Sequence, residues 1–325
     1  MGDNQYFREE EQEFFYRELN TFVPDRIFDV HAHVNHPNFY TLDIPGLPSI
    51  IGYNEYRKFI EYLHPARQVA AMFLAFSLDE KKVPLANEAT AQAVAADSNC
   101  KGLFFVRPHD DPEWVRDEVN RLRLHGLKCY HTFSSTRPTW EAEIPSYLPE
   151  KFVKVADEEN WVITLHIAKS RALADPSNIY WIRNYCKKYS NIKLILAHSS
   201  RGFQPSHNFE GLPQLIDLNN LFFDTSANCA PHAHETILRM MGHKKLLYGA
   251  DSLVVSHRRG TTVPVSDTFV FLYENQPIWD TKHKRVKPVL IGLEHLRSLK
   301  WACWSAKITD SQIEDVFWNN AAELF

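Results

Sequence analysis

The sequence predicts an α/β fold, a (β/α)₈ TIM barrel in which eight parallel strands alternate with helices around a closed ring. Three observations favour this fold over an open doubly wound sheet. Apolar, strand-like runs recur eight times, stretches with helical character separate them, and 325 residues accommodate eight strand–helix units in one chain. The expected strands are residues 26–34, 68–76, 100–107, 127–133, 161–167, 192–198, 221–227 and 246–251.

Helical patterns fill the intervals between these strands. The expected helices are residues 53–63, 85–97, 113–124, 147–158, 178–189, 209–218 and 232–241. Two further segments, 289–301 and 311–324, are available to close the ring. We therefore assign residues 26–325 to the barrel. Residues 1–25, which include an aromatic and acidic stretch, are expected to form a helical extension packed on its outside.

A long insertion follows the eighth predicted strand. Residues 252–288 show no regular pattern and include a basic run at 282–285. In a barrel, the segment after a strand lies at the carboxyl ends of the strands, where active sites are built. We therefore expect an irregular lid or an oligomer contact at this end, although the basic run by itself also fits a solvated surface loop.

Composition and charge exclude several classes of function. A formal net charge of −4 and a pI near 6.5 give no general attraction to nucleic acid or to anionic membranes. No apolar run approaches the roughly 18 residues of a membrane span, and the first residues lack the apolar core of a signal peptide. The 5 cysteines form no C-x-x-C pair, which argues against a disulfide framework. These features predict a soluble protein of the reducing cytoplasm.

The first predicted strand carries two histidines. His31 and His33 lie two residues apart in an apolar run, so on a strand they point to the same face and form half of a metal site. A second His-x-His pair provides a control. His232 and His234 lead into a helical pattern, where positions i and i+2 diverge by roughly 200° and do not share one ion.

Three more metal-competent side chains end other predicted strands. His166 ends the fifth strand, His198 the sixth and Asp251 the eighth. Taken singly, any of the 16 histidines is more simply a core or rim residue. Together the residues fall at one end of a barrel, and imidazole and carboxylate are the usual ligands of catalytic zinc. The joint pattern therefore predicts a metal site.

As a set, these motifs resemble those of the amidohydrolase superfamily. The closest similarity is to its amidohydrolase-related branch of metal-dependent hydrolases and non-oxidative decarboxylases. The motifs are Asp29-x-His31-x-His33, His166, His198, Gly249-Ala250-Asp251 and the terminal Asn319-Asn320-Ala321. The resemblance spans residues 26–325 and implies a metal-binding barrel, and in this branch a homo-oligomer is expected.

The resemblance also implies a set of metal ligands. His31, His33, His166 and Asp251 would hold one ion, expected to be Zn²⁺. His198 would act as a catalytic base and acid, or would bind a second metal ion. Asp251 would also be catalytic, accepting a proton from the attacking water.

Two further residues keep alternative interpretations. Lys128 lies on the fourth strand, where two-metal members of the superfamily use a carboxylated lysine to bridge their ions. We prefer an unmodified lysine near the substrate. Asp29 shares strand parity with His31 and His33, so it is expected beneath them, either as a buried carboxylate satisfied by neighbouring donors or as a catalytic group.

The implied activity is hydrolysis. A metal-activated water would attack a carbonyl of a small amide, ester or lactone that bears a carboxylate. Arg201, Lys128 and Arg171 are candidates to bind that carboxylate. The alternative is a metal-dependent decarboxylase of a small aromatic or enoic acid, and a third possibility is a barrel that binds a metal or sugar acid without turnover. The segments after His198 and Asp251 depart from the branch pattern at the substrate end and leave the substrate open.

Overall fold

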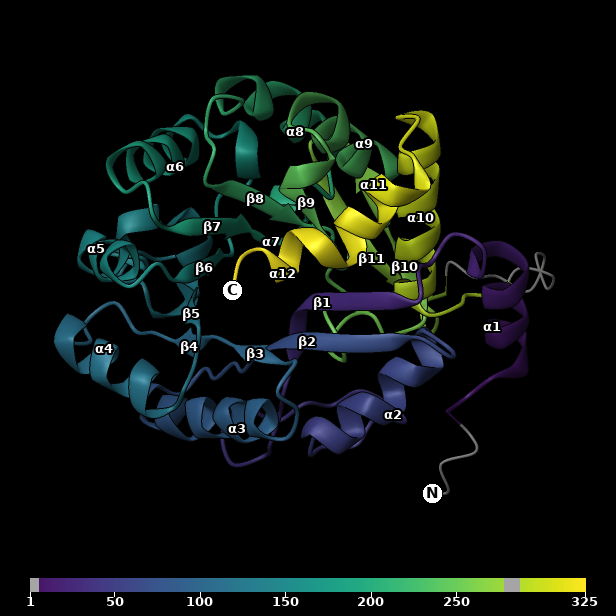
Figure 1. Ribbon diagram of the computed structural model, residues 1–325, viewed down its shortest axis with the longest axis horizontal. Helices are drawn as coiled ribbons and strands as arrows, with labels where there is room; N and C mark the ends of the chain where they lie inside the picture. Colours follow the sequence, from purple (N-terminus) through teal and green to yellow (C-terminus); the bar gives the residue numbers. More distant parts are fainter. Residues whose placement is uncertain (1–5, 278–286) are drawn as a thin grey trace.

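The computed structural model describes residues 6–277 and 287–325, and in these residues parallel strands form most of a ring (Figure 1). Hydrogen bonding links them in two sheets, in the orders β1-β2-β3 and β4-β5-β6-β7-β8-β9. The strands are β1 Arg26–His33, β2 Gln68–Leu74, β3 Lys101–Gly102, β4 Phe104–Phe105, β5 Gly126–Cys129, β6 Val162–Leu165, β7 Lys193–Leu196, β8 Leu221–Asp224 and β9 Leu246–Leu247.

Backbone hydrogen bonds join the two sheets at both seams. Between β3 and β4, the N–H of Leu103 donates to the carbonyl of Phe73 at 2.9 Å, so β3 and β4 occupy one position in the ring. At the other seam, the N–H of Val30 donates to the carbonyl of Tyr248 at 3.0 Å, directly after β9. The ring therefore closes, and the predicted TIM barrel is confirmed.

Helices cover the outside of the ring. They are α2 Tyr53–Leu63, α3 Val83–Ala95, α4 Pro112–Arg121, α5 Glu150–Glu158, α6 Pro176–Lys188, α8 Pro205–Gly211, α9 Pro231–Met240 and α10 Ile291–Ser305. Several begin earlier than predicted because proline occupies their first turn, where its missing N–H costs nothing. Asp111 and Asp175 cap two of these starts by accepting hydrogen bonds from backbone N–H groups.

A bulge in β1 changes which side chains face the interior. The pairing with β2 shifts register between Asp29 and Ala32. Phe28 and Val30 belong to the core cluster inside the ring, yet His31 next to Val30 also lies at the interior, because a bulge lets neighbouring side chains share a face. The expectation that Asp29 lies beneath the histidines, by strand parity, was therefore wrong.

Asp29 instead ties the first and last strands of the ring together. Its buried carboxylate accepts hydrogen bonds from the N–H of Ala250 at 2.8 Å and the hydroxyl of Ser252 at 2.9 Å. On the helix side, the hydroxyl of Tyr56 from α2 donates to it at 3.3 Å. Burial raises the pKa of Asp29 to about 6. Its arrangement is that of a carboxylate satisfied by neighbouring donors.

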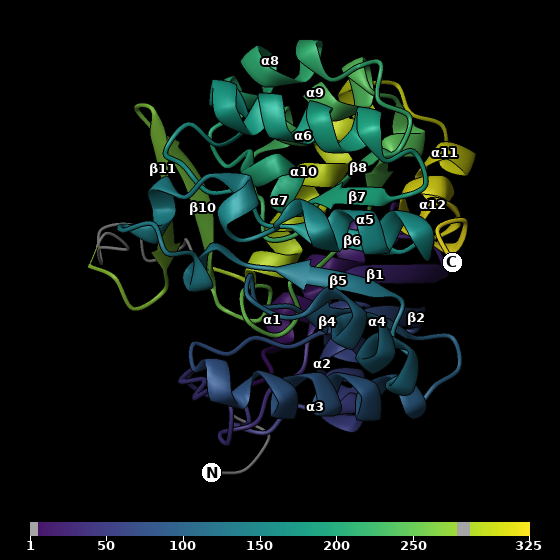
Figure 2. The ribbon, with the colours of Figure 1, turned by 90° about the vertical axis from the view of Figure 1, so that its left-hand side faces the viewer.

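The insertion after the last barrel strand contains a β-hairpin, where an irregular segment was expected. Strands β10 Gly260–Val265 and β11 Thr268–Tyr273 pair antiparallel. Figure 2 shows the hairpin beyond one end of the ring, while α12 Asn320–Ala322 and the C-terminus lie at the other. The alternating pattern of residues 268–273, with Phe269 and Phe271 on one face, is the signal that was missed. The basic run at 282–285 lies outside the described residues.

The N-terminal segment packs against this same part of the molecule. Helix α1 Glu9–Phe14 continues into a π-helical turn, Phe15–Leu19, and buries Phe14, Phe15 and Leu19. Arg259 and Glu11 form an ion pair at 2.7 Å, and both side chains are largely buried. In the described residues, no helix combines the length and apolarity that crossing a membrane requires.

Buried histidines away from the histidine cluster are expected to make stability depend on pH. Burial lowers the pKa of His64 to about 3 and of His234 and His257 to about 4. In the unfolded chain they titrate near their usual value of about 6.5. As the pH falls below that value, the unfolded state takes up protons that the folded state does not, so each histidine weakens folding by about 1.4 kcal/mol per pH unit.

Urea unfolding at several pH values between 7 and 4, with chelator present, checks this prediction. Asp29 and Glu294 act in the opposite direction over part of the window, because burial raises their pKa values. Burial also lowers the pKa values of His125, His131 and His295, which add to the effect of the three histidines. The control His109→Gln changes a half-exposed histidine and is expected to leave the slope unchanged. A free energy of unfolding that stays constant from pH 7 to pH 4.5 contradicts the prediction.

Candidate metal and substrate site

A cavity of about 420 Å³ opens at the carboxyl ends of the barrel strands. Six of the residues singled out in the sequence line it: His31, His33, His166, His198, Arg201 and Asp251. The remaining walls are largely aromatic and apolar, and they consist of Val34, Asn35, Tyr40, Leu42, Phe76, Tyr130, Trp140, Phe203, Ala227, Val254, Val255, Phe269 and Phe271. Residues 135 positions apart on the chain, His31 and His166, thus face one space.

His31, His33 and Asp251 form a tight cluster in this cavity. Nε2 of His33 lies 3.1 Å from Oδ1 of Asp251, and the rings of His31 and His33 are 5.3 Å apart. One ligand atom from each residue lies within 4.8 Å of the others. Burial favours the neutral acid of Asp251, but the hydrogen bond from His33 and the adjacent imidazoles outweigh it and hold the pKa of Asp251 well below its usual range.

Asp224, at the end of β8, makes hydrogen bonds to both His31 and His198 and so fixes their positions. Its Oδ2 lies 2.9 Å from Nδ1 of His31, and its Oδ1 accepts the backbone N–H of His198 at 2.9 Å. A carboxylate accepts, so the ring of His31 donates from Nδ1 and keeps Nε2 free as a ligand atom. Sequence analysis missed Asp224 because the predicted strand ran on to residue 227 and placed it mid-strand, whereas β8 ends at Asp224.

His198 is held in a defined tautomer. Ser226 donates its hydroxyl proton to Asp224 at 2.5 Å, so its oxygen is left to accept from Nδ1 of His198 at 2.9 Å. Nε2 of His198 therefore carries no proton, and burial lowers the pKa of this imidazole to about 4. The ring lies 5.0 Å from that of His31 and 5.2 Å from that of His166.

The backbone that carries His198 is left-handed. The segment α7, Ala197–Arg201, follows β7, and its residues from His198 onward have φ between 52° and 59°. Such a conformation costs about 1–2 kcal/mol for each residue other than glycine. Hydrogen bonds offset the cost: Asn208 donates to the carbonyl of Ser199 at 3.0 Å and accepts from Ser200 at 2.7 Å. This turn presents both His198 and Arg201 to the cavity.

His166 lies in the cavity, but it belongs neither to the cluster of His31, His33 and Asp251 nor to the group around Asp224. Its ring stacks 4.9 Å from that of Tyr130, and its buried Nδ1 has no hydrogen-bond partner among the described residues. Burial and the neighbouring imidazole of His198 lower its pKa well below the usual value. A neutral ring with a vacant nitrogen is suited to bind a cation.

Lys128 is buried on β5, close to the histidines. Its side chain is among the most buried of the large side chains, and its Nζ has no hydrogen-bond partner within the described part of the chain. The ammonium lies 5.3 Å from the ring centre of Tyr130. Burial lowers the pKa of Lys128, and the carboxylates of Asp224 and Asp251 oppose that change. Lys128 is absent from the cavity lining.

The two candidate arginines lie in different places. Arg201 lines the cavity with its guanidinium 4.5 Å from the ring centre of Trp140 and 5.8 Å from that of Phe269. It donates to the carbonyl of Lys169 at 2.5 Å. Arg171, by contrast, pairs with Glu210 on the surface, and its side chain is 44% exposed. The structure therefore does not bring Arg171 to the site, which corrects the expectation for that residue.

The residues present fit a divalent metal ion. Tetrahedral zinc ligands at about 2.0–2.2 Å from an ion lie about 3.3–3.6 Å from one another, slightly more than the 3.1 Å between His33 and Asp251. His31, His198 and Asp224 form a second group with ligand atoms within 4.8 Å, and it shares His31 with the first. Buried neutral imidazoles beside an ionised carboxylate are the donor set that zinc and related ions prefer.

Comparison with known proteins decides the family. A family model described as amidohydrolase matches residues 28–325. The chain belongs to the amidohydrolase family. Members of this family are generally metal-dependent, in agreement with the clusters described above. No curated protein matches by sequence.

Several solved structures share the amidohydrolase fold of this chain at low sequence identity. The 5-carboxyvanillate decarboxylase LigW of Sphingomonas paucimobilis has a TM-score of 0.57 at 13% identity, covering 93% of this chain and 99% of its own. A 2,6-dihydroxybenzoate decarboxylase from Rhizobium has a TM-score of 0.58 at 12% identity, and the match covers 92% of this chain and 98% of that one. A probable 2-pyrone-4,6-dicarboxylic acid hydrolase from Acinetobacter baumannii has a TM-score of 0.56 at 15% identity, and the match covers 92% of this chain and 98% of that one. At these identities, the similarity shows the fold.

Replacing Asp224 with asparagine is expected to weaken metal binding by this amidohydrolase about 10- to 100-fold. The amide cannot accept as strongly from Nδ1 of His31, so the ring loses its fixed tautomer and orientation. Calorimetric titration of the metal-free protein with Zn²⁺ measures the change. The control Asp217→Asn alters a carboxylate in a surface ion pair. Unchanged zinc affinity in the Asp224 variant contradicts the role given to this residue.

Proposed function

We propose that the protein is a metal-dependent hydrolase that cleaves a small amide, ester or lactone bearing a carboxylate. The observation that carries this proposal is the ionised carboxylate of Asp251, 3.1 Å from His33, at the end of an aromatic-walled cavity. His31, His33, Asp251 and His166 would hold the ion, which we take to be one Zn²⁺. When bound there, a zinc ion would polarise the substrate carbonyl and acidify a nearby water.

The chain's own residues would move the protons. Asp251 stays ionised and can accept a proton from the attacking water on a carboxylate oxygen. Nε2 of His198 carries no proton in the resting protein, so it can take up that proton and deliver it to the leaving group. Both side chains are buried, so solvent competes little for the transferred proton.

Arg201 would orient the substrate. Its guanidinium lies against two aromatic rings at the cavity wall and suits bidentate contact with a carboxylate. We propose that Lys128 remains an unmodified lysine beneath the site. Carboxylation of Lys128 would instead bridge two ions and make His198 a ligand, and metal analysis that finds two ions per chain would support this alternative.

A second candidate function is decarboxylation of a small aromatic acid. The aromatic walls favour it, since Phe76, Tyr130, Trp140 and Phe203 can enclose a planar ring. Among proteins of similar fold, two decarboxylases act on substituted benzoates, whereas a third protein is a probable hydrolase. In decarboxylation the same ion would orient the acid and no water would add to the carbonyl.

Product analysis separates the two functions. The zinc-loaded protein is incubated with a panel of lactones, amides and hydroxybenzoates, and products are identified by mass spectrometry with parallel CO₂ detection. Ring opening or amide cleavage supports the hydrolase, and CO₂ release supports the decarboxylase. Turnover of no panel member, combined with ligand-induced stabilisation that His198→Asn leaves unchanged, would favour a binding barrel without turnover.

Two further expectations stand as proposals. We propose that the chain assembles as a homo-oligomer and acts in the cytoplasm, where its 5 cysteines, all free in the structure, stay reduced. Light scattering of the purified protein measures the oligomeric state.

A further inference from the structure

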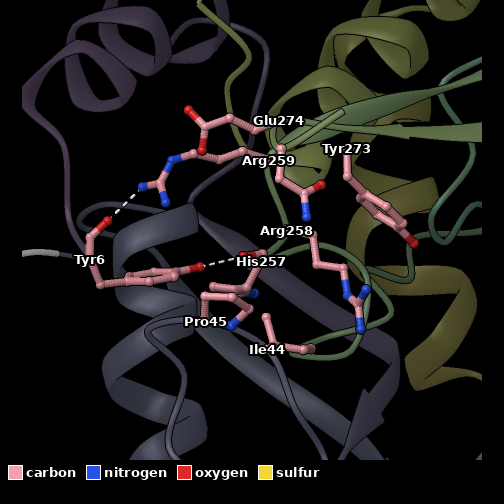
Figure 3. A pocket seen from close by; sticks show the side chains of 9 residues that line it. Tyr6, Ile44, Pro45, His257, Arg258, Arg259, Tyr273 and Glu274 are labelled. Carbon is pink, nitrogen blue, oxygen red and sulfur yellow. Dashed lines mark hydrogen bonds between the residues drawn. The ribbon is translucent and has the colours of Figure 1, made fainter. Parts of the chain in front are cut away.

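A second pocket of about 250 Å³, shown in Figure 3, is lined by segments that also line the catalytic cavity. The same three segments line both spaces: the loop after β1, the segment after Asp251, and strand β11. The loop after β1 contributes Tyr40 and Leu42 to the cavity and Ile44 to this outer pocket. The segment after Asp251 contributes Val255 to the cavity and Arg258 to the outer pocket. The two spaces are therefore neighbours with shared walls.

One face of β11 runs along both spaces. Phe269, Phe271 and Tyr273 are alternate residues, so they point to the same side of the strand. Their rings follow one another at centroid distances of 5.8 Å and 5.7 Å. The first two line the catalytic cavity and the third lines the outer pocket. A ligand lying along this face would extend from one space into the other.

Among the described residues, Arg258 is a charged lining residue of the outer pocket without an ion-pair partner. The other charged residues there are paired: Arg259 with Glu11, and Glu274 with Arg8. Arg258 forms no ion pair with any carboxylate in residues 6–277 and 287–325. Its Nε donates to the carbonyl of Val254 at 3.1 Å, and its guanidinium lies 5.0 Å from the ring centre of Tyr273.

Tyr273 contacts both Arg258 and the aromatic wall of the cavity, because its ring lies 5.0 Å from the guanidinium and 5.7 Å from the ring of Phe271. Burial raises the pKa of the Tyr273 phenol, Arg258 lowers it, and the charge of Asp251 raises it further. Figure 3 shows Arg258 between Tyr273 and Ile44, so its guanidinium faces the space that these residues enclose.

We propose that the outer pocket is a second acid-binding subsite, in which Arg258 holds the distal carboxylate of an elongated dicarboxylate substrate. The apolar middle of the molecule lies along the Phe269 and Phe271 face of β11. Its other end, which reacts, lies in the catalytic cavity near Arg201. The inference rests on the proposed function, because it takes that cavity as the place of reaction.

Binding measurements on the full-length, zinc-loaded protein test the subsite without turnover. The probes are succinate, adipate, suberate and sebacate, each compared with its monomethyl ester, which has nearly the same length and one charge fewer. For at least one chain length, the diacid is expected to bind about tenfold more tightly than its ester, because a guanidinium–carboxylate pair is charge-assisted and bidentate. Calorimetry gives both affinities.

Variants assign that preference to Arg258. Arg258→Gln is expected to reduce the diacid-to-ester ratio to within twofold while leaving the affinity of the ester unchanged. Arg258→Lys keeps the charge but loses the bidentate geometry, so it should restore part of the ratio. The control Arg171→Gln removes a surface arginine and should leave the ratio unchanged. Unfolding midpoints confirm that each variant is folded.

Two results would overturn the inference. One is a wild-type protein that prefers no diacid over its ester at any length, and the other is an undiminished preference in Arg258→Gln. Failure of the proposed function is distinguishable, because it would appear as absence of turnover on the substrate panel while these binding ratios remain measurable.

Discussion

Replacing Asp251 with asparagine is expected to lower kcat on the order of 10²- to 10⁴-fold, the range for loss of a positioned general base. The amide can neither accept the proton of the attacking water nor balance the charge of a bound cation. The substitution also replaces the charged acceptor of Nε2 of His33, 3.1 Å away, with a neutral and weaker one. Steady-state kinetics on the best substrate of the panel, at saturating Zn²⁺, measures the change.

A fall in kcat with an unchanged melting temperature separates catalysis from folding in this variant. Asp217→Asn is the matched control, since its carboxylate lies on the surface and pairs with Arg183 and Lys187. Activity of the Asp251 variant within threefold of the wild type would remove the basis of the proposed mechanism.

Chelation is expected to abolish turnover and to destabilise the fold. Without an ion, the buried His31, His33 and Asp251 lose their common partner. A ligand present at a hundred times its dissociation constant stabilises the folded state by about 2.7 kcal/mol, and its removal withdraws that amount. Dialysis against chelator, followed by activity assays and urea unfolding, measures both losses, and added Zn²⁺ should reverse them.

The variant Arg201→Gln provides the comparison for this metal effect. It is expected to weaken substrate binding but to show the same chelator-dependent loss of stability, because Arg201 lies against Trp140 and Phe269 and is not among the proposed ligands. Full activity after the metal content has fallen below one tenth of an equivalent would contradict metal dependence.

The barrel, and the location of the candidate site at the carboxyl ends of its strands, could be predicted from the sequence. Parallel strands buried on both sides read as apolar runs, so their positions were visible without the structure. Because the carboxyl ends of such strands converge, His31, His166, His198 and Asp251 could be expected to meet, and all of them line one cavity. Their chemical roles remain predictions, which the variants above test.

Features that depend on tertiary contacts could not be predicted in this way. The placement of Asp29 depended on the regular alternation of side chains along a strand, and the bulge in β1 interrupts that alternation. No local sequence pattern predicts this bulge. Arg171 and Arg201 follow strand ends alike, but only the left-handed turn after β7 directs Arg201 inward. The role of Asp224 depends on hydrogen bonds to His31 on β1 and to His198 in the turn after β7.

Closure of the ring by Asp29 has a consequence for how the protein is made. The hydrogen bond from Ala250 to Asp29 joins positions 221 residues apart, and Asp251 follows directly. At about 5–20 residues per second, a ribosome needs on the order of ten to forty seconds to reach the second position after the first. His166 is synthesised within that interval, so for part of it three of the proposed ligands exist without the fourth. The proposed metal site gains its only carboxylate, Asp251, when the last strand has been synthesised and has paired with the first.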